Sequence, residues 1–447
     1  MIESIEAGVS WVNGWLWGSV LLILLVGVGI TLMVGLRFIP VRKLPIGFRQ
    51  LFGKRKEEGD GDILPFNALM TSLSGTIGTG NIVGVASAIA IGGPGALFWM
   101  WCTAVVGLAT KYSEAVLAVH FREKDSLGQH VGGPMYYIQN GLGKKFVWMA
   151  VCFSIFGALA GFGIGNTVQV SSIAHGLEVS LGMPRLLTGL VVAVLVGAVI
   201  LGGIKRIGSV AGKIVPVMSV AYIGLCGVVI VMNLSSLPSV LIEILESAFS
   251  PVAATGGFAG STIMIAVRMG VSRGVFSNEA GLGSAPIAHA SAQTNSPVRQ
   301  GTLAMLGTFI DTLVICTMTG VAIVLSGVWT QDVQGMELSI LAMNTLLPAS
   351  GNLIVVSGMV IFAFTTVLGW ALYGERCAEY LFGVKIILPY RILWVLAVPV
   401  GAVMDLRFIW NCADMLNGLM ALPNLVALLL LSRVVFSLTR DYFSQDE

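Results

Sequence analysis

The chain has 447 residues, of which 56% are hydrophobic and only 11% charged, with a formal net charge of +2. A soluble domain carries about 25% charged residues, so this composition excludes a soluble enzyme, a nucleic-acid-binding protein and a disordered chain. It is typical of a polytopic membrane protein, for which we expect contact with membrane lipid and none with nucleic acid. The 56 glycines are a further excess.

Apolar stretches long enough to cross a bilayer, about 20 residues each, occur eleven times. They cover residues 16–36, 63–91, 96–120, 146–174, 186–203, 214–233, 259–288, 303–328, 352–374, 388–404 and 416–436. Runs of this length exclude barrel strands and predict an all-helical membrane protein with eleven transmembrane helices. The gaps between them are too short to hold a soluble domain.

The basic residues between these stretches predict the orientation. If the first span runs from outside to inside, the inside segments hold 19 Lys and Arg, and the outside segments hold only Arg185 and Arg407. Short cytoplasmic loops are enriched in basic residues. We therefore expect a multi-pass protein of the plasma membrane, with its N-terminus outside and its C-terminus in the cytoplasm.

Two of the spans contain glycine and polar residues at mid-membrane depth. The first, 63–91, contains SLSGTIGTGNIVGVA, and the second, 259–288, contains SRGVFSNEAGLGSAP. Interrupted helices at matching places of two inverted halves indicate a secondary transporter. The expected division is an extra N-terminal helix with a basic loop (1–62), two inverted five-helix repeats (63–233 and 259–436) and a cytoplasmic tail (437–447).

The first interruption, at 75–81, has three glycines in six residues, each of which weakens a helix by about 1 kcal/mol relative to alanine. The freed amides of Thr79 and Gly80 would receive a carboxylate at the start of the next half-helix. The carbonyls of Ser74 and Ile77 would face a cation. The alternative is a small-residue face, including Gly80, that packs against a neighbouring helix.

The second interruption, at 276–286, places polar side chains beside flexible backbone. Asn278 and the carbonyls near Phe276 and Ser277 are candidate acceptors for a substrate ammonium. Like the first interruption, it leaves backbone N–H and C=O groups without hydrogen-bond partners. Lipid cannot supply such partners, but a bound solute can.

Acidic residues lie within the expected spans at Glu114, Glu279 and Asp311. Glu279 either serves the function directly or forms a structural ion pair with Arg273 or Arg268, and both interpretations stay open. Asp311 is a candidate for binding a cation or a proton, with interhelical hydrogen bonding as the alternative. For Glu114, near the inner interface, pairing with Lys111 three residues earlier is sufficient.

Two adjacent hydroxyls, Thr365 and Thr366, come one helical turn before Trp370. Thr366 and Trp370 are four residues apart and share a helix face. Hydroxyl and carbonyl oxygens together suit Na⁺, and Trp370 would cap a pocket beside them. The alternative is that both threonines bond back to their own helix. Gln169 is a candidate substrate contact, whereas for Asn166 we expect interhelical hydrogen bonding.

Two long segments, GGPGALFWMWCTAVVG (92–107) and RGVFSNEAGLGSAP (273–286), resemble the alanine/glycine:cation symporter family. The resemblance covers essentially the whole chain and includes SLSGTIGTGNIVGVA, GGPMYYI (132–138) and TTVLGW (365–370). It implies a five-plus-five inverted-repeat fold of the leucine-transporter type, Na⁺ as the coupling ion, and alanine or glycine as the substrate.

The resemblance also implies two sets of site residues. The substrate set is Thr76, Gly78, Thr79, Gly80, Gln169, Phe276, Ser277, Asn278, Thr366 and Trp370. The Na⁺ set is Ser74, Ile77, Phe362, Thr365 and Thr366. Trp370 would limit the space for the substrate side chain. Asp311 is an acid where two-ion members of the fold carry an amide, so we expect one Na⁺ site.

We therefore expect a monomeric, non-enzymatic Na⁺-coupled symporter that takes up alanine or glycine by alternating access. H⁺ coupling or amino-acid exchange by the same fold is the alternative. An intramembrane hydrolase would need paired aspartates, a Ser/His pair or a histidine metal site, and the spacings indicate none of these. An ion channel would conduct without amino acid and without saturation by alanine.

Overall fold

The structure is a computed structural model that describes residues 2–53, 59–249, 263–348, 350–404 and 406–444. The helices of the first part are α1 (Ile2–Trp15), α2 (Leu21–Gly35), α3 (Ile39–Arg42), α4 (Leu44–Phe52), α5 (Pro65–Thr76), α6 (Val85–Gly92), α7 (Gly95–His120), α8 (Pro134–Tyr137), α9 (Val147–Ala160), α10 (Val168–Leu181), α11 (Arg185–Ile200), α12 (Gly203–Met232) and α13 (Leu237–Phe249). Those of the second part are α14 (Ile263–Asn278), α15 (Ala285–Ala290), α16 (Pro297–Thr308), α17 (Thr317–Ser326), α18 (Gly335–Leu346), α19 (Gly351–Phe382), α20 (Ile387–Val403), α21 (Leu406–Leu430) and α22 (Ser432–Ser444).

Short elements connect some of these helices. Wider π-helical turns continue them at η1 (Leu16–Val20), η2 (Gly80–Gly84), η3 (Ile138–Leu142), η5 (Gly161–Thr167) and η7 (Phe309–Cys316). Between α7 and α8 the strands β1 (Glu123–Lys124) and β2 (His130–Val131) pair in an antiparallel hairpin. The predicted all-helical class is therefore confirmed, apart from this hairpin.

Within the described residues, eight helical segments are long and apolar enough to cross a membrane, and a ninth results if the bent pair α5 and η2–α6 is counted as one span. The apolar helix α11 is shorter, with 16 residues. The first residues of the expected span 259–288 lie outside the described residues. The structure thus supports a polytopic membrane protein, and the division into eleven spans stays a prediction.

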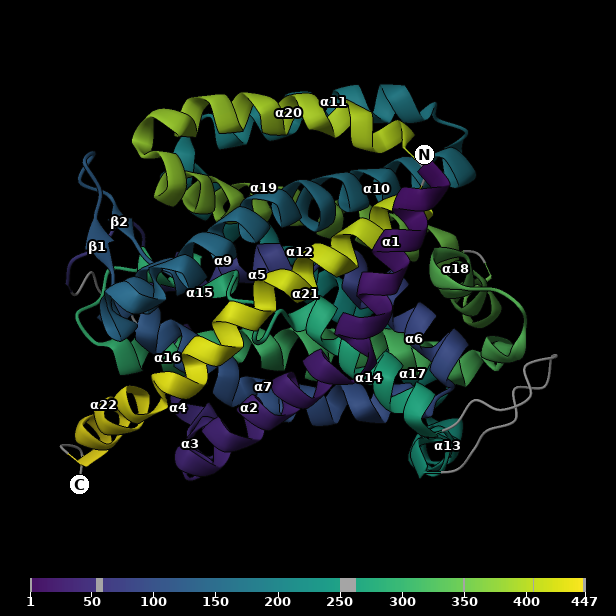
Figure 1. The fold of residues 1–447 in the computed structure, drawn as a ribbon. Coiled ribbons are helices and arrows are strands. Elements are labelled where there is room, and N and C mark those ends of the chain that lie inside the picture. The colour runs from purple at the N-terminus through teal and green to yellow at the C-terminus, as the bar shows by residue number, and fades with distance from the viewer. Residues whose placement is uncertain (1, 54–58, 250–262, 349, 405, 445–447) are drawn as a thin grey trace.

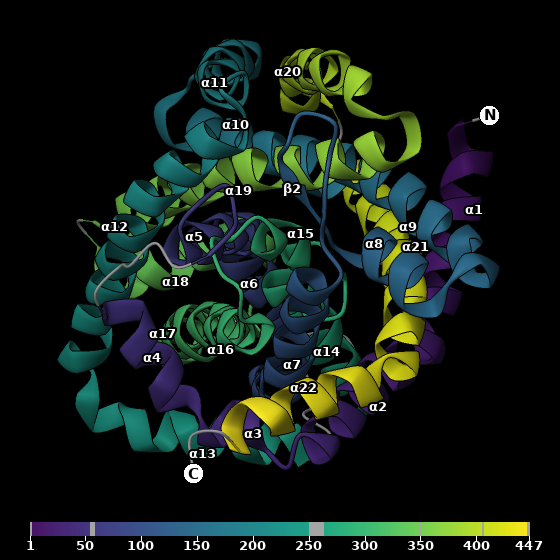
Figure 2. The same ribbon diagram turned by 90° about the vertical axis from the view of Figure 1, so that its left-hand side faces the viewer.

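The helices run between two opposite ends of the molecule (Figure 1). The β1–β2 hairpin, α3, α4 and α22 lie at one end, and α13 and α18 lie at the other. In the end-on view, α5, α6, α7 and α14 to α16 occupy the middle (Figure 2). This agrees with burial, because almost every residue of α7 after Thr103 is inaccessible.

The outer helices present apolar side chains to the surroundings. Helix α11 packs against α20 at the edge of the molecule, visible in both views (Figures 1 and 2). Exposed apolar residues of α11, α12 and α20 include Leu190, Val194, Val217, Val228, Leu393 and Leu396. Apolar surface of this extent suits lipid chains rather than water.

Both predicted helix interruptions are confirmed. Helix α5 ends at Thr76, and the chain resumes as η2 and α6 with a bend of 52°. Helix α14 ends at Asn278, and α15 begins only at Ala285. Between them the backbone has positive φ angles at Glu279 (57°), Gly281 (94°) and Gly283 (82°), which a helix cannot accommodate.

Candidate functional site

At the first helix break, two consecutive backbone N–H groups donate hydrogen bonds to side-chain oxygens instead of helical carbonyls. The Gly78 N–H donates to Asn81 Oδ1 (2.9 Å), and the Thr79 N–H donates to Gln169 Oε1 (3.2 Å). In an unbroken α-helix these amides would bond to the carbonyls four residues earlier, including that of Ser74. Those carbonyls are released from the helix. Gln169 Oε1 occupies the place at Thr79 where the sequence predicts a carboxylate oxygen.

The second break diverts two consecutive amides in the same way. The Ala280 N–H donates to Asn278 Oδ1 (2.9 Å), and the Gly281 N–H donates to Glu114 Oε1 (3.2 Å). The carbonyls four residues earlier, at 276 and 277, lose their helical donors. A buried carbonyl needs a partner, so this pair can accept hydrogen bonds from an ammonium group.

A closed cavity of about 10 Å³ lies between the two breaks. Its lining residues are Gly75, Thr76, Gly78, Gly80, Ile164, Gln169, Phe276, Glu279, Thr366 and Trp370. The structure thus brings together seven of the ten predicted substrate residues, and Thr79 joins them through its bond to Gln169. A space of this size holds about one water molecule. An amino acid therefore needs side chains such as Gln169 to move.

Of the predicted Na⁺ residues, Thr366 lines this cavity, and its hydroxyl contacts two of the other predicted oxygens. The Thr366 hydroxyl is 3.1 Å from the Ile77 carbonyl oxygen and 3.0 Å from that of Phe362. The Thr365 hydroxyl is 2.9 Å from the Phe362 oxygen. Back-bonding of both threonines to their own helix is therefore seen, but Thr366 also reaches across to the first break. Ser74 supplies a released carbonyl there.

Glu114 holds the second break and does not pair with Lys111, so that expectation is wrong. Its buried Oε1 accepts hydrogen bonds from the N–H groups of Gly281 (3.2 Å) and Gly283 (3.1 Å) and from Asn424 Nδ2 (2.7 Å). Lys111 is fully buried, and its ammonium makes no hydrogen bond within the described part of the chain. The carboxylate goes to the break because amides freed there have no helical acceptor.

Asp311 connects both broken helices to η7. Its carboxylate accepts hydrogen bonds from Asn81 Nδ2 (2.7 Å), Ser277 Oγ (2.7 Å) and Thr312 Oγ1 (2.8 Å). Asn278 Nδ2 donates to Thr312 Oγ1 (3.0 Å). The side chains of Ser277 and Asn278 thus belong to this cluster and are not among the residues that line the cavity. This differs from the predicted role of the Asn278 side chain, whereas the prediction for Ser277 concerned its carbonyl. Interhelical bonding also holds for Asn166, whose Nδ2 donates to the Trp394 carbonyl (2.9 Å).

Glu279 pairs with neither Arg273 nor Arg268, so the ion-pair interpretation is wrong. Its Oε1 accepts a hydrogen bond from Trp370 Nε1 (2.6 Å), and its Oε2 accepts one from Ser284 Oγ (2.6 Å). Glu279 follows the last residue of α14, and its carboxylate is held within the second break by these two bonds. Sequence reasoning could not find the bond to Trp370, since the two residues lie 91 positions apart.

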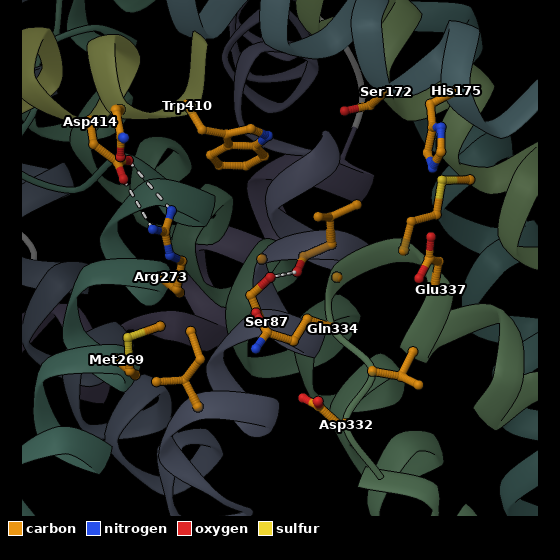
Figure 3. A pocket seen from close by; sticks show the side chains of 17 residues that line it. Ser87, Ser172, His175, Met269, Arg273, Asp332, Gln334, Glu337, Trp410 and Asp414 are labelled. Carbon is orange, nitrogen blue, oxygen red and sulfur yellow. Dashed lines mark hydrogen bonds and ion pairs between the residues drawn. The ribbon is translucent and has the colours of Figure 1, made fainter. Parts of the chain in front are cut away.

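A larger cavity of about 750 Å³ opens at the α18 end of the molecule; we call it the vestibule. There Arg273 and Asp414 form an ion pair (3.0 Å), with Trp410 beside it (Figure 3). Phe276 stacks on Trp410 with ring centroids 4.8 Å apart, and the Arg273 guanidinium covers both rings. Phe276 lines the small cavity and Trp410 lines the vestibule, so this layer separates the two spaces.

At the opposite end, the segments 60–63 and 291–294 are joined in what we call the clasp. Four main-chain hydrogen bonds of 2.8–3.2 Å connect them. The Arg122 guanidinium donates to four carbonyl oxygens at 2.6–3.0 Å, namely those of Asp60, Ala290, Ala292 and Thr294. The clasp ties the segment before α5 to the segment after α15. No local motif signals it.

The sequence of this chain matches one known protein family over nearly its whole length. The model of the sodium:alanine symporter family matches residues 2–447. The chain belongs to this family. The symporter is therefore a transporter and not an enzyme, and its apolar helices are those of a multi-pass membrane protein.

Relatives of this symporter match over nearly their full length. The sodium/alanine symporter AgcS of Methanococcus maripaludis is 49% identical over 444 residues, which cover 97% of this chain and 96% of the relative. A protein of Haemophilus influenzae described as an uncharacterized transporter is 48% identical over 445 residues, 99% and 97% of the two chains. The probable sodium/glutamine symporter GlnT of Bacillus subtilis is 39% identical over 450 residues, 100% and 92% of the two chains.

Proposed function

We propose that the protein couples Na⁺ entry to the uptake of alanine or glycine across the plasma membrane. The observation that carries this proposal is the matched pair of breaks. Each diverts two consecutive amides to side chains and releases two carbonyls, beside one closed cavity. Backbone groups freed at membrane depth are the ligands that transporters of interrupted helices use for a zwitterion and a cation.

The substrate carboxylate replaces Gln169 Oε1 as the acceptor of the Thr79 N–H. Gln169 is held on the other side by a bond from its Nε2 to the Ile164 carbonyl (2.9 Å), so its side chain can turn without leaving the cavity wall. The substrate ammonium binds the carbonyls released at 276 and 277. The small volume and the Trp370 indole favour a hydrogen or methyl side chain.

Na⁺ binds the oxygens of Thr365 and Thr366 together with the carbonyls of Ser74, Ile77 and Phe362. The two ligands are coupled because substrate and ion both order the first break, so each favours the binding of the other. One inward charge across 100 mV supplies about 2.3 kcal/mol, enough for roughly 50-fold accumulation.

The architecture that fits this proposal has eleven spans, with α1 and α2 outside a five-plus-five inverted repeat. In Figure 1 the two chain ends lie at opposite ends of the molecule, which agrees with an odd number of crossings. The vestibule then faces outward and the clasp faces the cytoplasm. In alternating access, either the layer of Phe276 and Trp410 opens toward the outside or the clasp opens toward the cytoplasm, but never both at once.

The test is alanine uptake into proteoliposomes with and without an inward Na⁺ gradient. We expect concentrative uptake that requires Na⁺ and saturates with alanine. Unchanged uptake when K⁺ replaces Na⁺ at fixed pH would refute Na⁺ coupling. An imposed pH gradient, compared with preloaded amino acid, would then separate H⁺ coupling from exchange.

A further inference from the structure

The Trp370 indole, one wall of the closed cavity, is held from three directions. Its Cβ packs on Gly165, where any side chain would overlap it. Its ring meets Tyr373 edge-on, with centroids 5.5 Å apart. Its Nε1–H donates to Glu279 Oε1 (2.6 Å). The indole is therefore held at its Cβ by Gly165, at its ring by Tyr373 and at its Nε1 by Glu279, and only the last contact comes from a helix break.

Glu279 occupies a backbone conformation that residues with a side chain rarely adopt, at φ 57°. The other two positive φ angles of this break belong to Gly281 and Gly283. A glutamate where glycine would be unstrained indicates that its side chain is needed, and strain of this kind is found at functional sites. The carboxylate is further fixed by Ser284 Oγ, which donates to Oε2 (2.6 Å).

We propose that Glu279 is a positioning residue that sets the largest side chain the protein transports, by holding the Trp370 indole against the cavity. This inference rests on the proposed amino-acid transport. Glu279 and Trp370 are each about 1% exposed, so neither side chain has water to replace the bond between them. Both carboxylate oxygens already accept protein hydrogen bonds, which leaves the substrate ammonium to the carbonyls at 276 and 277. Once Gln169 has moved, the site admits glycine and alanine, and the fixed indole excludes 2-aminobutyrate and glutamine.

The test compares kcat/KM for Na⁺-driven uptake of alanine, 2-aminobutyrate and glutamine. Glu279→Gly suits the positive φ and removes the acceptor for the indole. Glu279→Gln keeps an oxygen acceptor, and Ser284 can accept from its amide. Trp370→Phe keeps a ring but lacks the N–H donor. Since one methylene changes selectivity by about 10–200-fold, we expect the alanine to 2-aminobutyrate ratio to fall about tenfold in Glu279→Gly and Trp370→Phe.

The Gln variant decides between positioning and direct binding. We expect it to keep the wild-type ratio. An equal rise of KM for all three amino acids in Glu279→Gln would make the carboxylate the ammonium partner and overturn the proposal. A wild-type ratio of alanine to 2-aminobutyrate uptake in Glu279→Gly would also overturn the proposal. If the Gly variant does not fold, a wild-type ratio in Trp370→Phe has the same meaning. Absence of alanine uptake by the wild type would instead refute the transport function, and the size limit with it.

Discussion

Unpaired backbone groups at membrane depth cost several kcal/mol each, and the four amides that the two described breaks divert at 78, 79, 280 and 281 all have side-chain acceptors. Asn81 and Asn278 serve the break on their own helix, whereas Gln169 and Glu114 come from other helices. Only Gln169 also lines the cavity. In the proposed mechanism it is therefore the acceptor that the substrate carboxylate replaces, while the other three keep their bonds to the breaks.

Thr366 is the residue at which the Na⁺ proposal is most directly tested. Thr366→Ala removes an oxygen that lies 3.1 Å from the Ile77 carbonyl oxygen and 3.0 Å from that of Phe362. We expect the apparent KM for Na⁺ to rise about tenfold, equivalent to about 1.4 kcal/mol, measured as alanine uptake against Na⁺ concentration. Thr366→Ser keeps the oxygen and should restore the wild-type value. Unaltered Na⁺ dependence in the Ala variant would exclude this oxygen as a ligand.

At the scale of elements, the sequence reveals where helices break because the signal is local. Glycine and polar residues at 75–81 and 276–286 weaken a helix wherever it packs, and both breaks occur there. The shared face of Thr366 and Trp370 is equally local, since it follows from helical periodicity. The partners of Glu114 and Glu279 depend on which helices pack against the second break. The Glu114 bond to Gly281 and the Glu279 bond to Trp370 join residues 91 or more positions apart, and no spacing within one segment encodes them.

The clasp likewise joins segments that are far apart in the sequence, so local spacing does not predict it. Its contribution to stability can be tested. Arg122 donates to four carbonyl oxygens from two segments, so Arg122→Ala should destabilise the protein by about 2 kcal/mol, because hydrogen bonds from charged donors are the stronger ones and water replaces only part of them. The measurement is the Tm of the purified protein in detergent.

Lys124→Ala is the matched control for the clasp. Lys124 lies in the same hairpin and pairs with Asp60 at 3.6 Å, but both side chains are more than half exposed. Exposed pairs contribute about 0–1 kcal/mol, so the Tm should hardly change. An equal loss of Tm in the two variants would show that general surface charge, and not the clasp, stabilises this end.

At the scale of the whole molecule, the two ends differ both in basic residues and in accessibility. Among the described basic residues of the expected inside segments, Arg42 of α3, Arg49 of α4, Lys124 of β1, and Arg433 and Arg440 of α22 belong to elements at one end of the molecule (Figure 1). The vestibule opens at the other end, beside α18. A transporter with its N-terminus outside would thus present an open vestibule to the medium and a closed clasp to the cytoplasm.

Labelling from one side of the membrane tests this orientation. Gln334 lines the vestibule and Ser126 lies in the hairpin, and both are exposed. With an impermeant maleimide added to intact cells, Gln334→Cys should react, whereas Ser126→Cys should react only after permeabilisation. The native protein supplies the baseline, since Cys102, Cys152 and Cys412 are partly exposed. The reverse pattern would show that the orientation is the opposite of the one proposed. Reaction of both variants in intact cells would place residues 126 and 334 on the same side, which contradicts an odd number of crossings between them.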